Sequence, residues 1–213
     1  MKNVVCDLCF HHCVLKEGQR GFCRARIVKH GKIICENYGK ITSLALDPIE
    51  KKPLRRFHPG SNILSIGSYG CNMRCPFCQN HEISMSETIP YHPISPATLV
   101  ELACAKRKDG NIGIAFTYNE PLISYEYVFD CAVAAKAKDL AVVIVSNGMI
   151  ETTKLLALLP YIDAMNIDLK GFQDNIYEEL AGNLEQVKET IRCAAAHTHV
   201  EITSLIVPRR NDA

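Results

Sequence analysis

Apolar segments alternate with helical patterns through residues 62–208, and this alternation constrains the fold more than any other feature. Five segments rich in Val and Ile predict buried strands, each followed by a polar or glycine-containing loop: NILSIG, NIGIAFT, AVVIVSNG, AMNIDLKG and HVEITSLIVP. Helices are predicted at 95–109, 121–139, 151–159, 174–181 and 184–196. Alternating βα units predict an α/β fold with a parallel sheet, which binds ligands at the carboxyl ends of its strands.

The chain stops soon after the fifth of these strands, so the sequence predicts an open sheet or partial (βα) barrel instead of a closed barrel of eight strands. Residues 1–45 differ, because they are rich in cysteine and punctuated by glycine, and a proline- and charge-rich passage, DPIEKKPLRRFHPG, follows them. We therefore expect a Cys-rich N-terminal module and linker at 1–59 and the partial barrel at 60–213.

Bulk composition excludes several classes of protein. The 213 residues are 47% hydrophobic and 22% charged, as in ordinary globular domains, and the net charge of +1 gives no sign of a nucleic-acid or membrane-surface partner. The opening MKNVVCDLCFHHC lacks the apolar region of a signal peptide, and no apolar run approaches the roughly 18 residues that span a bilayer. We expect a cytoplasmic location, where eleven cysteines favour metal ligation over disulfides.

Three cysteines lie within eight positions in CNMRCPFC, directly after the first strand of the βα region. The thiolates of Cys71, Cys75 and Cys78 suffice for three irons of a 4Fe-4S cluster and leave the fourth iron open to amino and carboxylate groups of a substrate. The alternative is a zinc site that borrows a histidine such as His81.

Four further cysteines open the chain at spacings of two, three and nine residues: Cys6, Cys9, Cys13 and Cys23. They are enough to close one tetrahedral site, which indicates a structural zinc or a second iron-sulfur cluster. Zinc is favoured because a small module with little core needs a staple, while free thiols remain the alternative. His11 and His12 are expected to support the ligands and not to bind metal.

The remaining cysteines and a basic run have simpler interpretations. We expect the isolated thiols to behave as small buried apolar groups: Cys35, Cys104, Cys131 and Cys193. The basic run predicts a solvated face, and its sharper interpretation is a dock for an acidic protein or for a ligand's carboxylate: Lys51, Lys52, Arg55 and Arg56.

The CxxxCxxC spacing, with the aromatic Phe77 before the last cysteine, resembles the radical SAM superfamily. Further segments are similar to the AmmeMemoRadiSam-system radical SAM enzymes, which are pyruvate formate-lyase activating enzyme-like: DPIEKKPLRRFHPGS, TYNEPLISYE, SNGMI, DAMNIDLKGF and EITSLIVP. The N-terminal CDLCFHHCVLKEGQRGFCRAR also resembles that group's opening, with Phe10 where proline is usual. The resemblance covers essentially the whole chain.

This resemblance implies that Cys71, Cys75 and Cys78 hold a 4Fe-4S cluster whose fourth iron chelates S-adenosylmethionine (SAM). Reductive cleavage of SAM then gives a 5'-deoxyadenosyl radical, which abstracts hydrogen from an unidentified substrate. The resemblance also implies an electron donor such as flavodoxin or ferredoxin. It suggests a glycyl-radical protein as substrate, although another protein or a small molecule is equally allowed.

Residues at the strand ends take their expected roles from the same resemblance. Besides Phe77, the residues expected to contact SAM follow the second, third and fourth strands: Asn119, Glu120, Ser146, Asn147, Asp168 and Lys170. The simpler alternatives are that Glu120 caps the next helix and that Asp168 and Lys170 form a solvated ion pair.

A second hypothesis is a non-catalytic iron-sulfur or zinc-binding protein, or a truncated relative that has lost activity. The superfamily usually supplies a sixth strand with further SAM contacts, so the resemblance implies that the C-terminal strand and helix of the barrel are missing after VPRRNDA. Arg209 and Arg210 stand where the group usually has glycine. SAM binding discriminates between the hypotheses, because a storage protein need not bind it.

Overall fold

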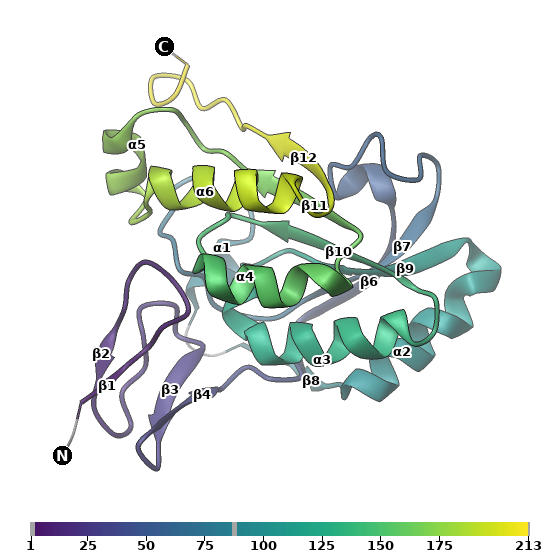
Figure 1. The fold of residues 1–213 in the computed structure, drawn as a ribbon, viewed down its shortest axis with the longest axis horizontal. Coiled ribbons are helices and arrows are strands. Elements are labelled where there is room, and N and C mark those ends of the chain that lie inside the picture. The colour runs from purple at the N-terminus through teal and green to yellow at the C-terminus, as the bar shows by residue number, and fades with distance from the viewer. Residues whose placement is uncertain (1–2, 87–88, 213) are drawn as a thin grey trace.

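A six-stranded sheet organises the computed structural model, which describes residues 3–86 and 89–212. The strand order is β12-β11-β10-β9-β7-β6 (Figure 1), with these bounds: β6 (Ser43–Pro48), β7 (Asn62–Gly67), β9 (Asn111–Phe116), β10 (Ala141–Ser146), β11 (Ala164–Asp168) and β12 (His199–Thr203). Strands β7, β9, β10, β11 and β12 pair in parallel, whereas β6 pairs antiparallel with β7. The predicted α/β fold with a parallel sheet is confirmed.

Helices follow the parallel strands as the sequence predicts. Four of them cover one face of the sheet in Figure 1: α2 (Pro96–Ala105), α3 (Tyr125–Lys136), α4 (Thr152–Leu158) and α6 (Leu184–Ala195). Shorter helical pieces are α1 (His81–Met85), α5 (Asp174–Glu179) and the 3-10 turns η1 (Ile49–Lys51), η2 (Lys106–Asp109), η3 (Pro121–Ser124) and η4 (Leu159–Tyr161). Ser95 caps α2, because its hydroxyl accepts a hydrogen bond from the Thr98 N–H at 3.1 Å.

The two faces of the sheet bury different side chains, since successive residues of a strand point to opposite faces. Larger residues such as Leu64, Ile114 and Ile144 pack under the helices. On the other face, small residues of the central strands leave room for the segment between β6 and β7, which buries Ile49 and Leu54 completely. This segment is therefore part of the core, although its prolines and charges predict a linker.

Short antiparallel hairpins form the N-terminal region and lie beside the sheet in Figure 1: β1 (Val4–Val5) with β2 (Val14–Leu15), and β3 (Arg26–Lys29) with β4 (Lys32–Cys35). A further pair joins β5 (Lys40–Ile41) to β8 (His92–Pro93). Strand β6 belongs to the main sheet, although the sequence assigned residues 43–48 to the N-terminal region, because its six residues pair with all of β7.

The four isolated cysteines are buried to different degrees. Cys35 and Cys131 are buried as predicted, whereas Cys104 and Cys193 are half-buried and pack against the edge of the core. No helix among residues 3–86 and 89–212 is both long enough and apolar enough to span a bilayer.

Candidate functional site

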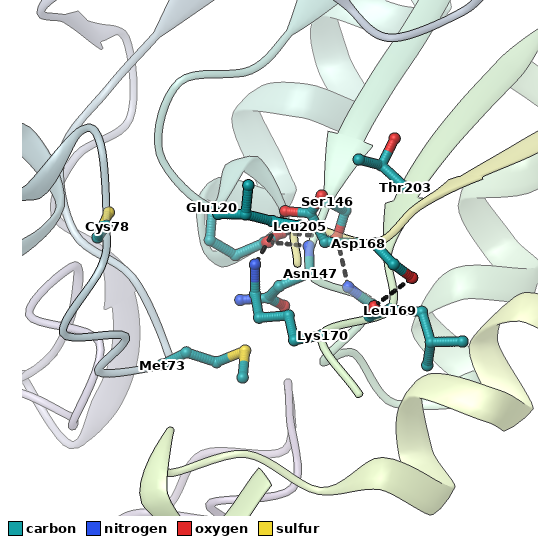
Figure 2. Close-up of polar contacts among 12 residues, drawn as sticks. Met73, Cys78, Glu120, Ser146, Asn147, Asp168, Leu169, Lys170, Thr203 and Leu205 are labelled. Atoms are coloured by element: carbon teal, nitrogen blue, oxygen red, sulfur yellow. Dashed lines mark hydrogen bonds and ion pairs between the residues drawn. The ribbon is translucent and has the colours of Figure 1, made fainter. Parts of the chain in front are cut away.

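Loops from the carboxyl ends of β7, β9, β10, β11 and β12 surround one cavity of about 320 Å³. Every residue predicted for the cluster and SAM lines it, from the three cysteines and Phe77 to the six polar residues at the strand ends. Figure 2 shows how Glu120, Asn147 and Lys170 approach from the sheet, with Met73 and Cys78 on the cysteine loop. The carboxyl ends of the parallel strands thus bring together residues that lie up to 99 positions apart in the sequence, from Cys71 to Lys170.

The cysteine loop is fixed to its surroundings just before its first cysteine and again at Arg74. Gly70 precedes it with φ +87°, and a Cβ at this position would lie 2.4 Å from the Cys23 carbonyl oxygen, so only glycine fits. Within the loop, the Arg74 N–H donates to the Leu180 carbonyl at 2.8 Å and the Cys78 N–H donates to the Cys75 carbonyl at 3.1 Å. These backbone bonds hold the thiols at the cavity wall.

The thiols lie in a poorly solvated setting. Burial raises the pKa of Cys71 to about 12 and also raises the pKa of Cys75. The Cys71 sulfur accepts weak hydrogen bonds from the Met73 N–H at 3.4 Å and from the Asn147 amide at 3.7 Å, while the Cys78 sulfur lies 3.3 Å from the Ser84 hydroxyl. Thiolates there need a bound cation to offset desolvation, and the iron of a bound cluster would supply it.

Among the described residues, no group of three His, Cys, Asp or Glu side chains is close enough together to bind one metal ion. The alternative of a zinc ion shared with His81 therefore has no preformed site in this part of the chain. A cluster imposes a different demand, because each thiolate binds its own iron and the sulfurs stay apart. Three separated thiols around a cavity with a polar far wall fit that donor pattern.

Glu120 is the most deeply buried carboxylate of the site, at 3% exposure. It accepts hydrogen bonds from the Leu122 N–H at 2.9 Å, the Ser146 hydroxyl at 3.0 Å and the Asn147 N–H at 2.7 Å. Burial raises the pKa of Glu120 to about 7 despite these donors. The bond to Leu122 shows that Glu120 does cap η3, the simpler of its two expected roles.

Asn119 acts mainly on the backbone around it. Its side-chain oxygen accepts from the Ser68 N–H at 2.9 Å, and its nitrogen donates to the carbonyl oxygens of Gly70 at 3.0 Å and of Glu120 at 3.2 Å. The amide therefore ties the end of β7 to the loop after β9. A contact from Asn119 to SAM stays a prediction.

Asp168 and Lys170 form an ion pair of 3.0 Å at the end of β11. The Lys170 side chain is only 17% exposed, so the pair is not the solvated one considered above. Burial opposes the charged amine, but the Asp168 carboxylate and the Cys75 sulfur outweigh it and raise the pKa of Lys170. The cavity therefore contains a permanent cation close to the cysteine loop, suited to a ligand's carboxylate.

Asn72 links the site to the N-terminal region. Its side chain accepts from the Asn147 amide at 2.8 Å and donates to the Met149 carbonyl at 2.7 Å, while its own carbonyl lies 2.8 Å from His11 Nε2. Sequence analysis missed this residue, because an Asn inside a cysteine motif has no distinctive spacing. His11 thus contacts the cysteine loop.

The four N-terminal cysteines line one small enclosed cavity together with His11. Burial raises the pKa of Cys9 to about 12 and also raises the pKa of Cys23, so a bound cation is needed to favour the thiolate form of these two residues. They gather as the spacing predicts, but the single-ion geometry of a zinc site is not present among the described residues. Their ligand stays a prediction.

In the basic run, Lys51, Arg55 and Arg56 are exposed as the sequence predicts, whereas Lys52 is not. Lys52 is buried at 2% exposure, pairs with Asp47 at 2.8 Å and lies 4.8 Å from the centre of the Tyr118 ring. The Tyr118 hydroxyl donates to the same carboxylate at 2.6 Å. Lys52 cannot dock an acidic partner, because its ammonium group is buried and already paired with Asp47.

Two more residues at the cavity, Thr203 and Leu205, come from the end of β12. The Thr203 hydroxyl accepts from the Asn166 amide at 2.9 Å. Their place near the end of the fifth strand was the only signal in the sequence, and the sequence-based prediction considered the arginines beyond them instead.

Residues 65–213 match the family described as the Radical SAM superfamily. The chain belongs to this superfamily. Membership implies an enzyme with a 4Fe-4S cluster and SAM, which is what the cysteine loop and the polar wall of the cavity fit. The narrower activating-enzyme subtype is a separate question.

The chain is also similar to two proteins of Methanocaldococcus jannaschii whose names give no activity. The chain is 43% identical over 213 residues to "Uncharacterized protein MJ0808" of Methanocaldococcus jannaschii, covering 99% of this chain and 62% of the relative. It is 33% identical over 128 residues to "Uncharacterized protein MJ0674" of the same organism, covering 56% of this chain and 32% of the relative. The chain thus spans less than two thirds of the length of these relatives.

Among solved structures, the chain matches "Structure of TYW1 with a lysine-pyruvate adduct bound" with a TM-score of 0.45 and 16% identity over 70% of this chain and 57% of that one. The crystal structure of QueE from Escherichia coli matches with a TM-score of 0.42 and 11% identity over 78% of this chain and 94% of that one.

Proposed function

We propose that the cavity holds SAM against a 4Fe-4S cluster on Cys71, Cys75 and Cys78, and that the enzyme abstracts hydrogen from its substrate. The observation that carries this proposal is the convergence of three thiols, a buried carboxylate and a paired lysine on one cavity. When bound and reduced, the cluster supplies the electron that cleaves SAM into methionine and the 5'-deoxyadenosyl radical.

The protein's own side chains bind and orient SAM. Glu120 receives the ammonium group, because a buried carboxylate gains most from an added cation. Lys170, which is held in place by Asp168, neutralises the carboxylate group of SAM. Ser146 and Asn147 offer polar contacts to the ribose or methionine part.

The remaining residues of the site have supporting roles. Phe77 forms an apolar part of the wall next to the last cysteine, and Asn119 keeps Glu120 in place through its bond to the Glu120 carbonyl. An apolar wall at Phe77 restricts the access of water, which protects a radical from side reactions.

The narrower identity rests on the resemblance of the sequence segments. It favours an AmmeMemoRadiSam-system enzyme of the pyruvate formate-lyase activating enzyme type, with flavodoxin or ferredoxin as electron donor and a glycyl-radical protein as substrate. The proposed layout is a Cys-rich module before a partial radical SAM barrel, in the cytoplasm. Zinc or a second iron-sulfur cluster on the N-terminal cysteines completes the proposal, supported by their shared cavity.

The test is anaerobic reconstitution with iron and sulfide, reduction with dithionite and chromatography for 5'-deoxyadenosine after SAM is added. The wild-type chain should form it, Cys75→Ala should not, and Cys193→Ala should, since this half-buried thiol lies outside the cavity. A cluster that assembles without SAM cleavage, in a chain that binds no SAM, would contradict the proposal and favour the non-catalytic alternative.

A further inference from the structure

A second and larger cavity, of about 990 Å³, lies between the N-terminal hairpins and the cysteine loop. Its described lining comes from the turn before β3, the residues around β4 and β5, Tyr69 after β7, Ser86 and residues 89–91, and one residue of the cysteine loop, Arg74. No described residue lines both this cavity and the SAM cavity. It is therefore a separate site, and it is within the size range of pockets that bind small organic ligands, roughly 300–1,000 Å³.

Positive charge is concentrated in this cavity although the whole chain is nearly neutral at +1. Its described lining contains four basic residues and one acid, Glu36: Arg20, Arg24, Lys40 and Arg74. Glu36 is already engaged, because Arg20 donates to both of its oxygens at 2.5 and 2.8 Å. No described carboxylate lies within ion-pair distance of the other three cations. Three like charges around one cavity repel one another, and a bound anion removes that cost.

Arg74 has donors to spare for such an anion. Its guanidinium donates to the carbonyl oxygens of Cys71 at 2.9 Å and Met73 at 3.0 Å and to that of Phe22, and its centre lies 3.9 Å from the centre of the Phe22 ring. A guanidinium has five N–H donors, so two remain beyond these three bonds. The group is held in place by its neighbours and is thus organised before a ligand arrives.

Aromatic rings form the rest of the recognition surface. Lys40 Nζ lies 5.0 Å from the centre of the Tyr91 ring and 5.9 Å from that of Tyr69, and both rings line the cavity beside Phe22. Cations next to ring faces suit a ligand that has an anionic group attached to a planar ring. We propose that this cavity binds an aromatic phosphate or carboxylate of low molecular weight, bridging the N-terminal hairpins and the cysteine loop.

The proposal is independent of radical chemistry, because the two cavities have no common described residue. Its test is calorimetric titration of the full chain with phenyl phosphate, in the presence of S-adenosylhomocysteine to occupy the SAM cavity. Arg24→Gln and Lys40→Gln should each weaken binding at least tenfold, since each removes a charge-assisted contact. Lys32→Gln is the matched control, because it removes an exposed charge from the same hairpin region outside the cavity.

The proposal is overturned if phenyl phosphate does not bind at millimolar concentration, or if Lys32→Gln weakens binding as much as Arg24→Gln does. Equal affinities for phenyl phosphate and inorganic phosphate would overturn the role of the rings. Binding of an acidic polypeptide such as polyglutamate, without binding of phenyl phosphate, would identify the surface as a protein dock and would also overturn the proposal. Circular dichroism of each variant verifies that the fold is intact.

Discussion

Replacing Glu120 by glutamine is predicted to change the pH dependence of folding in a direction that only a buried, destabilised carboxylate produces. The pKa of Glu120 rises from 4.5 to about 7 on folding, because burial disfavours its charge. Below pH 4.5 the group is protonated in both the folded and the unfolded chain and costs nothing. As the pH rises from 4.5 to above 7, ionisation of Glu120 comes to cost the folded wild-type protein about 3 kcal/mol, at about 1.4 kcal/mol for each unit by which its pKa is raised.

The glutamine variant removes this cost and introduces another. Its oxygen still accepts from the Leu122 N–H and the Ser146 hydroxyl, but its new amide group faces the Asn147 N–H, which loses an acceptor. An unsatisfied buried donor costs about 1–3 kcal/mol at every pH. Because the wild-type cost is about 3 kcal/mol at pH 8 and about 1 kcal/mol at pH 5, the variant should gain about 2 kcal/mol relative to wild type between these two pH values.

Urea unfolding at pH 5 and pH 8, followed by circular dichroism, measures this difference. Glu185→Gln is the control, because Glu185 is exposed and pairs with Lys188, so its pKa is lowered and no such gain is expected. The reasoning from burial is refuted if the Glu120→Gln variant loses stability relative to wild type between pH 5 and pH 8. That result would mean that the hydrogen-bond donors stabilise the charged carboxylate of Glu120 more than burial destabilises it. SAM affinity, measured anaerobically by calorimetry, should fall at least tenfold because the charge facing the ammonium is gone.

Three further predictions concern the surroundings of the site. Gly70→Ala should lower the free energy of unfolding by at least about 2 kcal/mol in urea titrations, since its φ is +87° and its Cβ would overlap the Cys23 carbonyl; an unchanged midpoint would contradict the packing. Asp47→Asn should cost about 3–5 kcal/mol in the same assay because Lys52 loses its buried counter-ion, and a cost below about 1 kcal/mol would show that Lys52 reaches water. Cys9→Ala should remove the N-terminal metal in elemental analysis, and an unchanged zinc and iron content would argue against that site.

The parallel sheet and its helices were predictable because their signals are local. Each strand of the βα region is rich in Val, Ile or other apolar residues, and α2 begins at a serine cap followed by proline. The place of β6 in the main sheet was not predicted, since it is set by the pairing with β7 and the sequence assigned these residues to the N-terminal region. The burial of Lys52 was hidden for the same reason, because Asp47 and Tyr118 reach it only in the folded chain.

At the site, the sequence predicted which residues gather but not how their hydrogen bonds are already used. Both N–H groups of the Asn119 amide and one site on its oxygen are occupied by backbone, which leaves a single acceptor site. Glu120 also keeps one site, because a carboxylate offers about four and three are filled, but that site bears charge in a region of low dielectric. Of Asn119 and Glu120, Glu120 is therefore the stronger ligand for an ammonium group, and Asn119 acts by holding Glu120 in position.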